Sequence, residues 1–337
     1  MICFAWDGFP QYAARCVGEF VKKTKEKVVV VATTPNVPIK GMEDVCGCEV
    51  IWVKGKCSIE DHLFFKVEDI KLLVVSGWAI PPFNLLSSKI RQCGGKVVAM
   101  VDNNYIFSFK EILKLIRFRL LLKNKYDGFF VPGKSGRKLL RFYGVKDSLI
   151  KEGMYSADAE LFFSEKPLSQ REKKIIFVGQ LCNRKNVLRM IEAFRRANDK
   201  NEWKLELYGC GPLRNQIQAI GGVSVYDFLQ PEQLAGKYRE SRAFCLGSVE
   251  EHWGLVVHEA ALSGCVLLLS DKVGAKEDLF GDNGYLFNPY KVAKIECAFR
   301  RMMEMSEAEL DLAQCKSINK AKEINVEKFT CSLLSFI

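Results

Sequence analysis

Two glutamates eight residues apart carry the strongest chemical signal in the chain. Glu251 lies in a loop after an apolar run, and Glu259 lies one to two turns into a helical pattern. Carboxylates at these positions can face one ligand and accept hydrogen bonds from its hydroxyl groups. The neighbours of Glu259 are apolar, so its helix is largely buried, and a glutamate inside it requires a partner. The pair therefore indicates a site for a ligand that is rich in hydroxyl groups. The alternative is that the two glutamates are simply exposed acidic residues.

A basic turn lies upstream of these acids. It spans residues 179–186, contains adjacent Arg184 and Lys185, and leads into a helical pattern. Cations beside a helix N-terminus form a good anion site, because the free N–H groups and the helix dipole both favour negative charge. We expect a diphosphate there, although a solvated basic turn has the same composition. Gly209 and Gly211 follow the next strand, where the backbone can approach a ligand closely.

Short apolar runs alternate with helical patterns, which is typical of buried parallel sheets covered by helices. Strands are expected at Val28–Thr33, Glu49–Val53, Leu72–Ser76, Lys96–Val101, Ile175–Gly179, Lys204–Tyr208, Ala243–Gly247 and Val266–Ser270. Helices are expected at Ala13–Lys23, Phe83–Gln92, Asn186–Ala197, Gly236–Glu240 and Trp253–Ser263. The alternation occurs twice, so we expect an α/β protein of two doubly wound, Rossmann-like domains with a cleft between them.

Five blocks of the second half occur in the order found in a known enzyme family. They are Val178–Lys185, Gly209–Pro212, the Glu251-to-Glu259 spacing followed by Ala260 and Gly264, Val273–Leu279, and Gly284–Pro289. Residues 174–290 thereby resemble a family 4 retaining glycosyltransferase of the two-domain glycosyltransferase B fold. The ending at residues 325–329 is similar to the family's terminal helix, which crosses back to the first domain. We therefore expect an acceptor domain at 1–165, a donor domain at 166–315 and a returning helix at 316–337.

The resemblance implies roles for residues of the second half. Lys185 would hold the donor diphosphate, Glu259 the ribose hydroxyls and Glu251, as a catalytic residue, the transferred sugar. The backbone N–H groups of Gly254 and Leu255 would help to hold phosphate. The donor side would also include Gly179, Gln180, Arg184, Gly211 and Trp253. Family members often have arginine at position 180, and Arg184 is the cation that would replace it here.

The first half matches the family less closely. Members often have a glycine-rich first turn and a histidine after a middle strand. This chain has Gly8 and Phe9 at the first turn, and Asp102 and Asn103 after the strand at residues 96–101. We expect Asp102 to take the histidine's place as a catalytic residue, with Gly8, Phe9 and Asn103 on the acceptor side. A helix N-cap at Asp102 and Asn103 is an equally simple alternative.

The basic excess lies entirely in the first half. Residues 1–150 hold 24 Lys/Arg and 14 Asp/Glu, a net charge of +10, whereas the remainder holds 26 of each. The segment from Lys110 to Lys146 contains 11 of these cations among many leucines and isoleucines. It is typical of a basic amphipathic helix that contacts anionic lipid. A core-packed helix with solvated charges is the alternative.

Several classes of protein are disfavoured. The 13 cysteines form no Cys-x-x-Cys pair and only three histidines occur, so we expect no metal site, and His252, His258 and His62 have no ligand role. No stretch has the roughly 20 apolar residues of a spanning helix. Free cysteines and the absence of a leader pattern predict a cytoplasmic protein, at the inner face of the membrane if the basic segment binds lipid.

The implied reaction is retaining transfer of a sugar from a nucleotide-diphosphate sugar to an acceptor hydroxyl, without a metal or other cofactor. The acceptor would be a carbohydrate or a lipid-linked molecule, as in the synthesis of cell-surface polysaccharide, lipopolysaccharide or glycolipid. A nucleotide-sugar epimerase of similar fold is one alternative. A non-catalytic binder of nucleotide sugars or nucleic acid is another. Nucleic acid is not an expected partner, because no aromatic residues alternate with the cations in an RNA-binding pattern.

Overall fold

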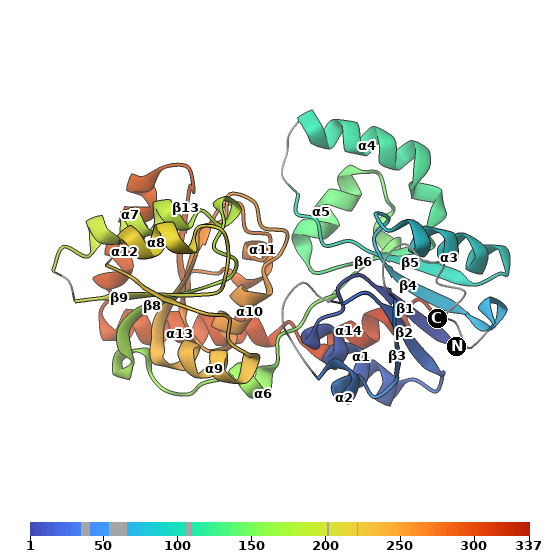
Figure 1. The fold of residues 1–337 in the computed structure, drawn as a ribbon, viewed down its shortest axis with the longest axis horizontal. Coiled ribbons are helices and arrows are strands. Elements are labelled where there is room, and N and C mark those ends of the chain that lie inside the picture. Colours follow the sequence, from blue (N-terminus) through green and yellow to red (C-terminus); the bar gives the residue numbers. More distant parts are fainter. Residues whose placement is uncertain (35–40, 54–65, 106–108, 201, 221) are drawn as a thin grey trace. The chain divides into compact units, whose positions relative to one another are not determined.

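The computed structural model describes residues 1–34, 41–53, 66–105, 109–200, 202–220 and 222–337. His62 lies outside the described residues, as does part of the segment before α4. The chain divides into two compact units (Figure 1). Unit 1 comprises Met1–Ser156 and Asn325–Ile337, and unit 2 comprises Ala157–Ile324.

Unit 1 is built on a parallel sheet whose strands follow the order β3-β2-β1-β4-β5-β6-β7 within the described residues. The strands are β1 (Ile2–Trp6), β2 (Val28–Ala32), β3 (Glu49–Trp52), β4 (Leu72–Ser76), β5 (Lys96–Met100), β6 (Gly128–Val131) and β7 (Ile150–Glu152). Its α-helices are α1 (Gln11–Lys23), α2 (Met42–Cys46), α3 (Pro81–Gln92), α4 (Phe109–Leu121), α5 (Lys134–Phe142) and α14 (Val326–Leu334). The strand order reverses between β1 and β4, which makes the loops after these two strands neighbours.

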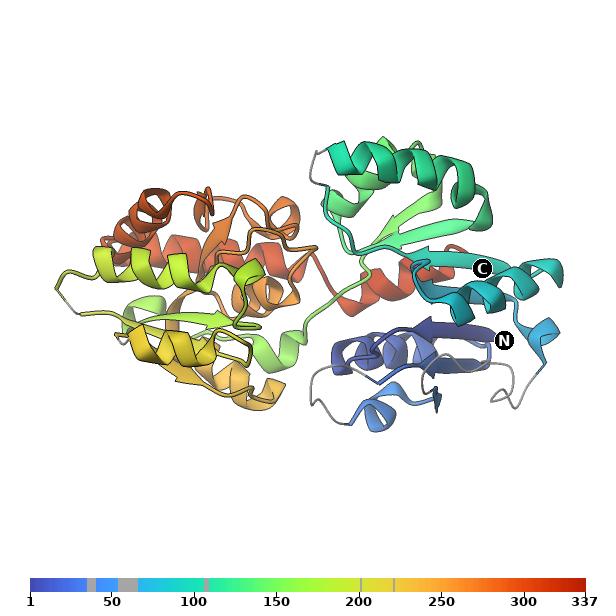
Figure 2. The same ribbon diagram turned by 45° about the horizontal axis from the view of Figure 1, so that its top comes forward.

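Unit 2 repeats this plan with the order β10-β9-β8-β11-β12-β13. The strands are β8 (Glu172–Val178), β9 (Lys204–Tyr208), β10 (Ser224–Tyr226), β11 (Ser241–Leu246), β12 (Val266–Ser270) and β13 (Gly284–Phe287). Its α-helices are α6 (Ala159–Phe162), α7 (Val187–Ala197), α8 (Arg214–Ile220), α9 (Pro231–Glu240), α10 (Leu255–Leu262), α11 (Lys276–Leu279), α12 (Val292–Met303) and α13 (Glu307–Lys322). Here the order reverses between β8 and β11. The expected pair of doubly wound parallel sheets is confirmed, and the turned view of Figure 2 shows the helices on both faces of each sheet.

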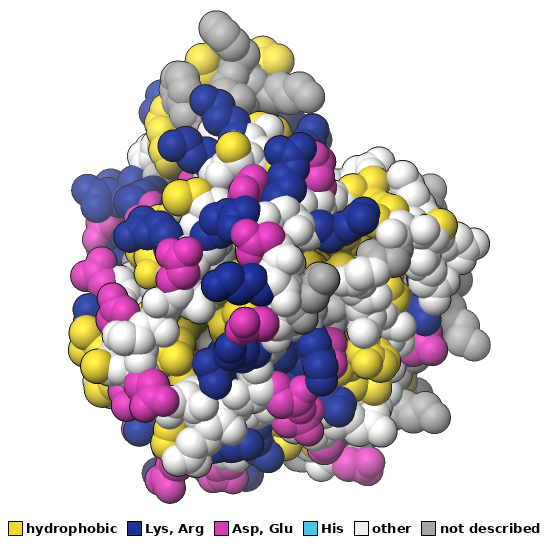
Figure 3. Space-filling model, turned by 90° about the vertical axis from the view of Figure 1, so that its left-hand side faces the viewer, with side chains coloured by type: hydrophobic (Ala, Val, Ile, Leu, Met, Phe, Trp, Pro, Cys, Tyr) yellow, Lys and Arg dark blue, Asp and Glu magenta, His cyan; other side chains and the backbone are white. Residues whose placement is uncertain are grey.

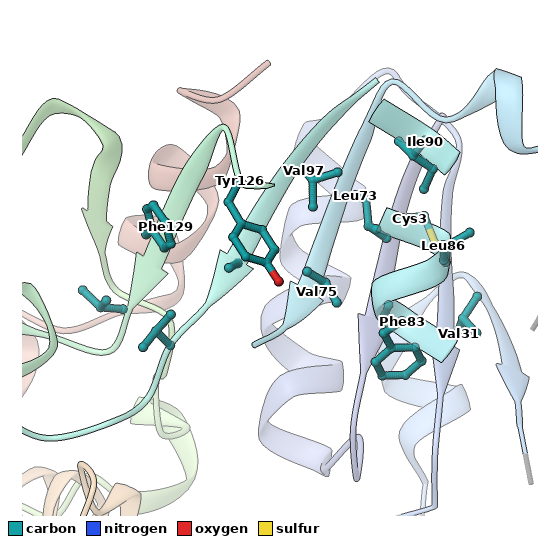
Figure 4. Packing of buried hydrophobic residues seen from close by; sticks show 14 of the residues in the cluster. Cys3, Val31, Leu73, Val75, Phe83, Leu86, Ile90, Val97, Tyr126 and Phe129 are labelled. Atoms are coloured by element: carbon teal, nitrogen blue, oxygen red, sulfur yellow. The ribbon is translucent and has the colours of Figure 1, made fainter. Parts of the chain in front are cut away.

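The inner strands of the unit 1 sheet are buried on both faces, whereas the edge strands β3 and β7 are partly exposed. Along β1, Cys3 and Ala5 belong to one apolar cluster, whereas Ile2 and Phe4 belong to another on the opposite face. This follows from the alternation of side chains along a strand. Helix α3 covers the first face, and Figure 4 shows its buried side chains over those of the strands. Helices α1 and α14 supply apolar residues to the second face.

The start of unit 2 differs from the predicted domain division. The units separate at Ser156, and α14 returns to unit 1 from Asn325, whereas 165 and 316 were the expected limits. The polar segment after Ala157 packs on unit 2, where the Leu168 N–H donates to Gln314 Oε1 at 3.0 Å. Helix α13 continues to Lys322 within unit 2 before the chain returns. The polar segment after Ala157 therefore belongs to unit 2.

Strand β8 also begins earlier than predicted, at Glu172. The reason is Lys174, which is 2% exposed although it is charged. Its Nζ lies 3.1 Å from Glu240 and 3.5 Å from Glu206. A buried lysine with carboxylate partners can sit in a central strand, and this pairing is not visible in the apolar pattern.

The surface of unit 2 carries both signs of charge. Figure 3 shows basic and acidic side chains interspersed over the face around α7 and α12. This agrees with the balanced charge of the second half of the chain. Among the residues that the structure describes, no helix has the length and apolar character needed to cross a bilayer.

The loops after β8 and β9 approach each other so closely that glycine is required. A Cβ on Gly209 would lie 2.1 Å from the carbonyl oxygen of Gly179, and one on Gly211 would lie 2.5 Å from that of Leu181. The Leu181 N–H donates to Cys210 O at 2.9 Å, which joins the two loops. Gly209 also has a φ of 145°, which other residues rarely adopt.

We predict that Gly209→Ala lowers the free energy of unfolding by more than about 2 kcal/mol, because backbone strain and overpacking add. Urea denaturation measures the change. Gly236→Ala is the matched control, since a Cβ at this helical position would meet nothing within 4 Å. It should be neutral or stabilise by up to about 1 kcal/mol. Equal effects of the two substitutions would contradict the close approach of the loops.

Candidate active site

The basic turn of unit 2 places Lys185 over the end of β8. A short 3-10 turn, η6 (Asn183–Lys185), ends at Asn186, whose φ of 58° lets α7 start at a sharp angle. The Asn186 side chain fixes this corner by donating to Pro289 O at 2.8 Å. Lys185 is buried, and its Nζ lies 3.9 Å from the position that a Cβ on Gly179 would occupy. The lysine therefore extends back toward the first turn of the unit.

Lys185 and Glu251 form a buried ion pair. Lys185 Nζ donates to Glu251 Oε2, which also accepts from Ser248 Oγ at 2.9 Å. Arg184 Nη1 lies 3.6 Å from the same oxygen and donates to the Glu250 carbonyl at 3.0 Å. The two loops come from β8 and β11, which are adjacent at the reversal of strand order. The structure thus brings together two predicted site residues that are 66 positions apart in sequence.

The loop after β12 forms backbone hydrogen bonds with the loop that carries Glu251. Glu251 forms a parallel β-bridge with Val273, and its carbonyl accepts the Gly274 N–H at 3.1 Å. A Cβ on Gly274 would lie 1.9 Å from His252 O, so only glycine fits. Residues 273–279 were singled out as a sequence block, and their role in the structure is to position the Glu251 loop.

Helix α10 begins directly after this loop. Gly254 adopts a φ of 97°, and the first N–H that bonds back to it is that of Val257, at 2.9 Å. The earlier N–H groups of the helix have no intrahelical carbonyl to bond. The backbone at Gly254 and Leu255 is therefore suited to an anion. Both residues are partly exposed.

Glu259 lies in α10 and is half-buried. Its Oε2 accepts a hydrogen bond from the Tyr238 hydroxyl at 3.1 Å. Burial raises the pKa of this carboxyl to about 7, and the tyrosine hydrogen bond opposes that shift. A carboxyl that titrates near neutrality is a frequent property of functional sites.

Trp253 and Gln180, which were also predicted to lie on the donor side, differ in burial. Trp253 is buried, with its ring 6.0 Å from that of His258 and its Nε1 donating to Asp278 at 3.3 Å. Trp253 thus supports the site from within the core. Gln180 is exposed at the end of β8.

His258 has a structural role. Its Nδ1 accepts the Ala157 N–H at 3.0 Å, so Nε2 carries the proton and donates to Ala321 O at 2.9 Å. Within the described ranges, no three His, Cys, Asp or Glu side chains gather as metal ligands would.

Unit 1 contains a pocket of about 350 Å³ at its own reversal of strand order. Its lining includes Gly8, Asp102 and Asn103, three residues predicted to lie on the acceptor side or in catalysis. The Gly8 N–H donates to Thr33 Oγ1 at 2.7 Å, which shapes the first turn. Asp102 accepts from the Tyr155 hydroxyl at 3.2 Å. Residues 103–105 are not helical, so the N-cap interpretation of Asp102 and Asn103 is wrong.

Phe9 is a core residue and not an acceptor-side one. Its side chain is fully buried, with ring centroids 5.6 Å from Trp6 and 6.4 Å from Trp52. Conversely, Tyr12 and Tyr155 line the pocket and were not expected there. No motif marks either tyrosine, and only the fold brings them next to Asp102.

The second half of the chain is similar to known glycosyltransferases. Residues 158–318 match the model of the family described as Glycosyl transferases group 1. Sulfoquinovosyl transferase SQD2 of Arabidopsis thaliana is 28% identical over 173 residues, which are 49% of this chain and 31% of that protein. An uncharacterized glycosyltransferase of Methanocaldococcus jannaschii is 26% identical over 113 residues, which are 32% of this chain and 29% of that protein. Each match thus spans less than a third of the relative.

Solved structures share the fold along the whole chain. HepE of Anabaena in complex with UDP-glucose has a TM-score of 0.75 at 14% identity and covers 100% of both chains. Sucrose-phosphate synthase of Thermosynechococcus elongatus has a TM-score of 0.73 at 16% identity and covers 99% of this chain and 98% of its own. The chain therefore has the glycosyltransferase B fold, and its residues 158–318 are similar to the glycosyl transferases group 1 family.

Proposed function

We propose that this protein is a retaining glycosyltransferase that moves a sugar from a nucleoside-diphosphate sugar to an acceptor hydroxyl group. The observation that carries the proposal is the buried Lys185–Glu251 pair, at the reversal of strand order in the unit that matches the family. Open parallel sheets bind ligands at that position, beyond the carboxyl ends of the strands. Glu259 and the start of α10 belong to the loop and helix that follow β11.

The donor diphosphate is proposed to bind Lys185, Arg184 and the N–H groups that begin α10. Negative charge grows on the leaving oxygen as the bond to the anomeric carbon breaks, and fixed cations and N–H dipoles stabilise it. These groups supply the positive charge that a divalent cation would otherwise provide, so we propose that the reaction needs no metal. UDP is the first nucleotide to test, since HepE was solved with UDP-glucose.

Glu251 is proposed to exchange partners when the donor binds. In the structure its carboxylate neutralises the buried Lys185, whose charge would be costly to leave without a partner. A diphosphate can take over Lys185, which leaves the carboxylate, still held by Ser248, to accept hydrogen bonds from the transferred sugar. The same pair would thus keep Lys185 neutralised before the donor binds and contact the sugar afterwards.

The proposed route to retention is attack by the acceptor hydroxyl on the same face of the sugar that the diphosphate leaves. We propose that the departing diphosphate takes the proton of that hydroxyl, and that Asp102 and Asn103 act on the acceptor side. The acceptor would be a carbohydrate or a lipid-linked molecule of a cell-surface polysaccharide or glycolipid pathway. A cytoplasmic site at the inner face of the membrane suits such an acceptor.

Helix α4 is the proposed contact with that membrane. Leu113, Ile116 and Leu120 lie three and four residues apart and are 70%, 50% and 77% exposed. The opposite face is anchored, because Phe118 is buried and Glu111 accepts from the Tyr143 hydroxyl at 2.7 Å. Lys114, Arg117, Arg119, Lys123 and Lys125 are the cations of residues 111–125. An apolar ridge flanked by cations suits an anionic lipid surface.

We predict that Glu251→Gln lowers sugar transfer at least about 100-fold, as expected when a transition-state contact is lost. The affinity for UDP should be kept or increased, because the diphosphate then pairs with Lys185 without competition from a carboxylate. Transfer is measured with EDTA present and UDP binding by calorimetry. Glu250→Gln, an exposed neighbour, is the control and should retain both properties. Unchanged transfer in Glu251→Gln would overturn its role, and conversion of the donor without an acceptor would favour an epimerase.

We predict that the affinity for UDP rises with pH up to about 7, by about tenfold per unit for an ideal single group, because only the ionised Glu259 accepts both ribose hydroxyls. Because the pKa of Glu259 is raised in the folded state, protonation of this carboxyl stabilises folding fully below the ordinary carboxyl pKa of 4.5. This stabilisation is lost as pH rises through about 7. Glu259→Gln is the control, because the diphosphate titrates equally in both proteins. A parallel pH dependence in the two would contradict the assignment.

We predict that Leu113→Ser combined with Leu120→Ser weakens binding to vesicles of phosphatidylcholine and phosphatidylglycerol about tenfold or more, since each exposed leucine contributes on the order of 1 kcal/mol. Cosedimentation measures the effect. Leu312→Ser is the matched control, because this leucine of α13 is also exposed, at 56%. Equal binding to pure phosphatidylcholine, or an equal loss in the control, would argue against α4.

A further inference from the structure

The pocket of unit 1 is acidic, although unit 1 itself is basic. Asp7 and Asp102 both contribute to its lining, and the described lining residues include no lysine or arginine. The first 150 residues nevertheless carry a net charge of +10. The cations of this half therefore lie elsewhere, on surfaces such as α4. A ligand that enters the pocket meets negative charge at close range.

Aromatic rings form much of the remaining wall. Trp78 is half-buried and held by neighbouring rings, with centroids 5.5 Å from Phe118 and 6.3 Å from Tyr126. Tyr12 and Tyr155 meet edge to face at 5.3 Å. A sugar ring presents C–H groups on its faces and hydroxyl groups on its rim, which such aromatic faces and polar edges can accommodate together. The volume of about 350 Å³ lies within the usual range of about 300–1,000 Å³ for small-molecule sites.

The two carboxylates are held in place by the fold. Asp7 Oδ1 accepts from Thr33 Oγ1 at 2.6 Å, and the Asp7 N–H donates to Ser76 Oγ at 3.0 Å. Asp102 is held by Tyr155, whose pKa is raised well above its usual value by burial and by the nearby carboxylate. The hydroxyl of Tyr155 therefore remains a donor to Asp102. Carboxylates accept hydrogen bonds from hydroxyl and ammonium groups and repel anions.

We propose that this pocket binds a sugar unit of the acceptor that carries no phosphate or carboxylate group, and that it prefers an amino sugar to its neutral counterpart. The proposal rests on the proposed function, in which unit 1 holds the acceptor. It goes beyond that function by naming the chemical class of the acceptor sugar. Asp7 and Asp102 are the residues that set this specificity.

The test measures sugar binding in the full chain without any donor. Saturation-transfer difference NMR is recorded with glucosamine, glucose and glucose 6-phosphate, and with the corresponding galactose and mannose derivatives. In at least one series the amino sugar should bind about fivefold more tightly than the neutral sugar, and the phosphate more weakly than either. A phosphorylated sugar that binds as well as its neutral counterpart, or no binding by any series, overturns the proposal.

Variants assign the selectivity to the carboxylates. Asp102→Asn and, separately, the exposed Asp7→Asn should reduce the preference for the amino sugar at least about twofold and relieve the rejection of the phosphate. The control is Asp44→Asn, because Asp44 of α2 is exposed and lies outside the pocket lining. This variant should keep the preference for the amino sugar and the rejection of the phosphate. Selectivity that survives in both pocket variants overturns the proposal. UDP binding to unit 2 and sugar transfer are measured separately, so a failure of the transferase function is distinguishable from a failure of the pocket assignment.

Discussion

The ion pair between Lys185 and Glu251 is the interaction on which the organisation of unit 2 depends. A lysine and a glutamate that are both nearly buried are stable only together, because either charge alone would lose its solvation without compensation. The surrounding loops are arranged to make that pairing possible. Ser248 occupies a second acceptor site of the carboxylate, and Gly274 lets another loop support the glutamate from behind. Lys185 is therefore held in one position by the surrounding loops.

The position of the pair follows from the topology and not from a local motif. Strands β8 and β11 lie side by side because the chain winds first to one side of β8 and then to the other. The helices that follow them diverge to opposite faces, and the loops between are left with space for a ligand. Unit 1 repeats the arrangement with β1 and β4, and its pocket lies at the corresponding place. The same topology thus recurs in both units, and the loops at the two reversals differ in charge, with Arg184 and Lys185 in unit 2 and Asp7 and Asp102 in unit 1.

Much of this could be predicted from the sequence, because apolar runs of strand length report directly on a buried parallel sheet. The bounds of β4, β9 and β12 agree with the predicted strands. Lys185, Glu251 and Glu259 were recognisable because their spacing resembles a family pattern. The start of β8 was missed, because Lys174 is charged and its partners are distant in the chain. Phe9 was misassigned, because position in a turn does not reveal which way a side chain points. The Tyr155–Asp102 contact joins residues 53 positions apart and has no sequence signal.

The distribution of charge carries a final constraint on the acceptor. A uniformly basic half would attract any anion, including free phosphate and nucleotides, to the wrong unit. With cations on α4 and aspartates in the pocket, unit 1 would separate the two proposed tasks, attraction to an anionic surface and recognition of a sugar. An acceptor that suits both features has an anionic or lipid-anchored portion and an uncharged or cationic sugar. Such a molecule would bring its hydroxyl to the pocket while its remaining part stays outside, which is the arrangement expected for transfer to a lipid-linked saccharide.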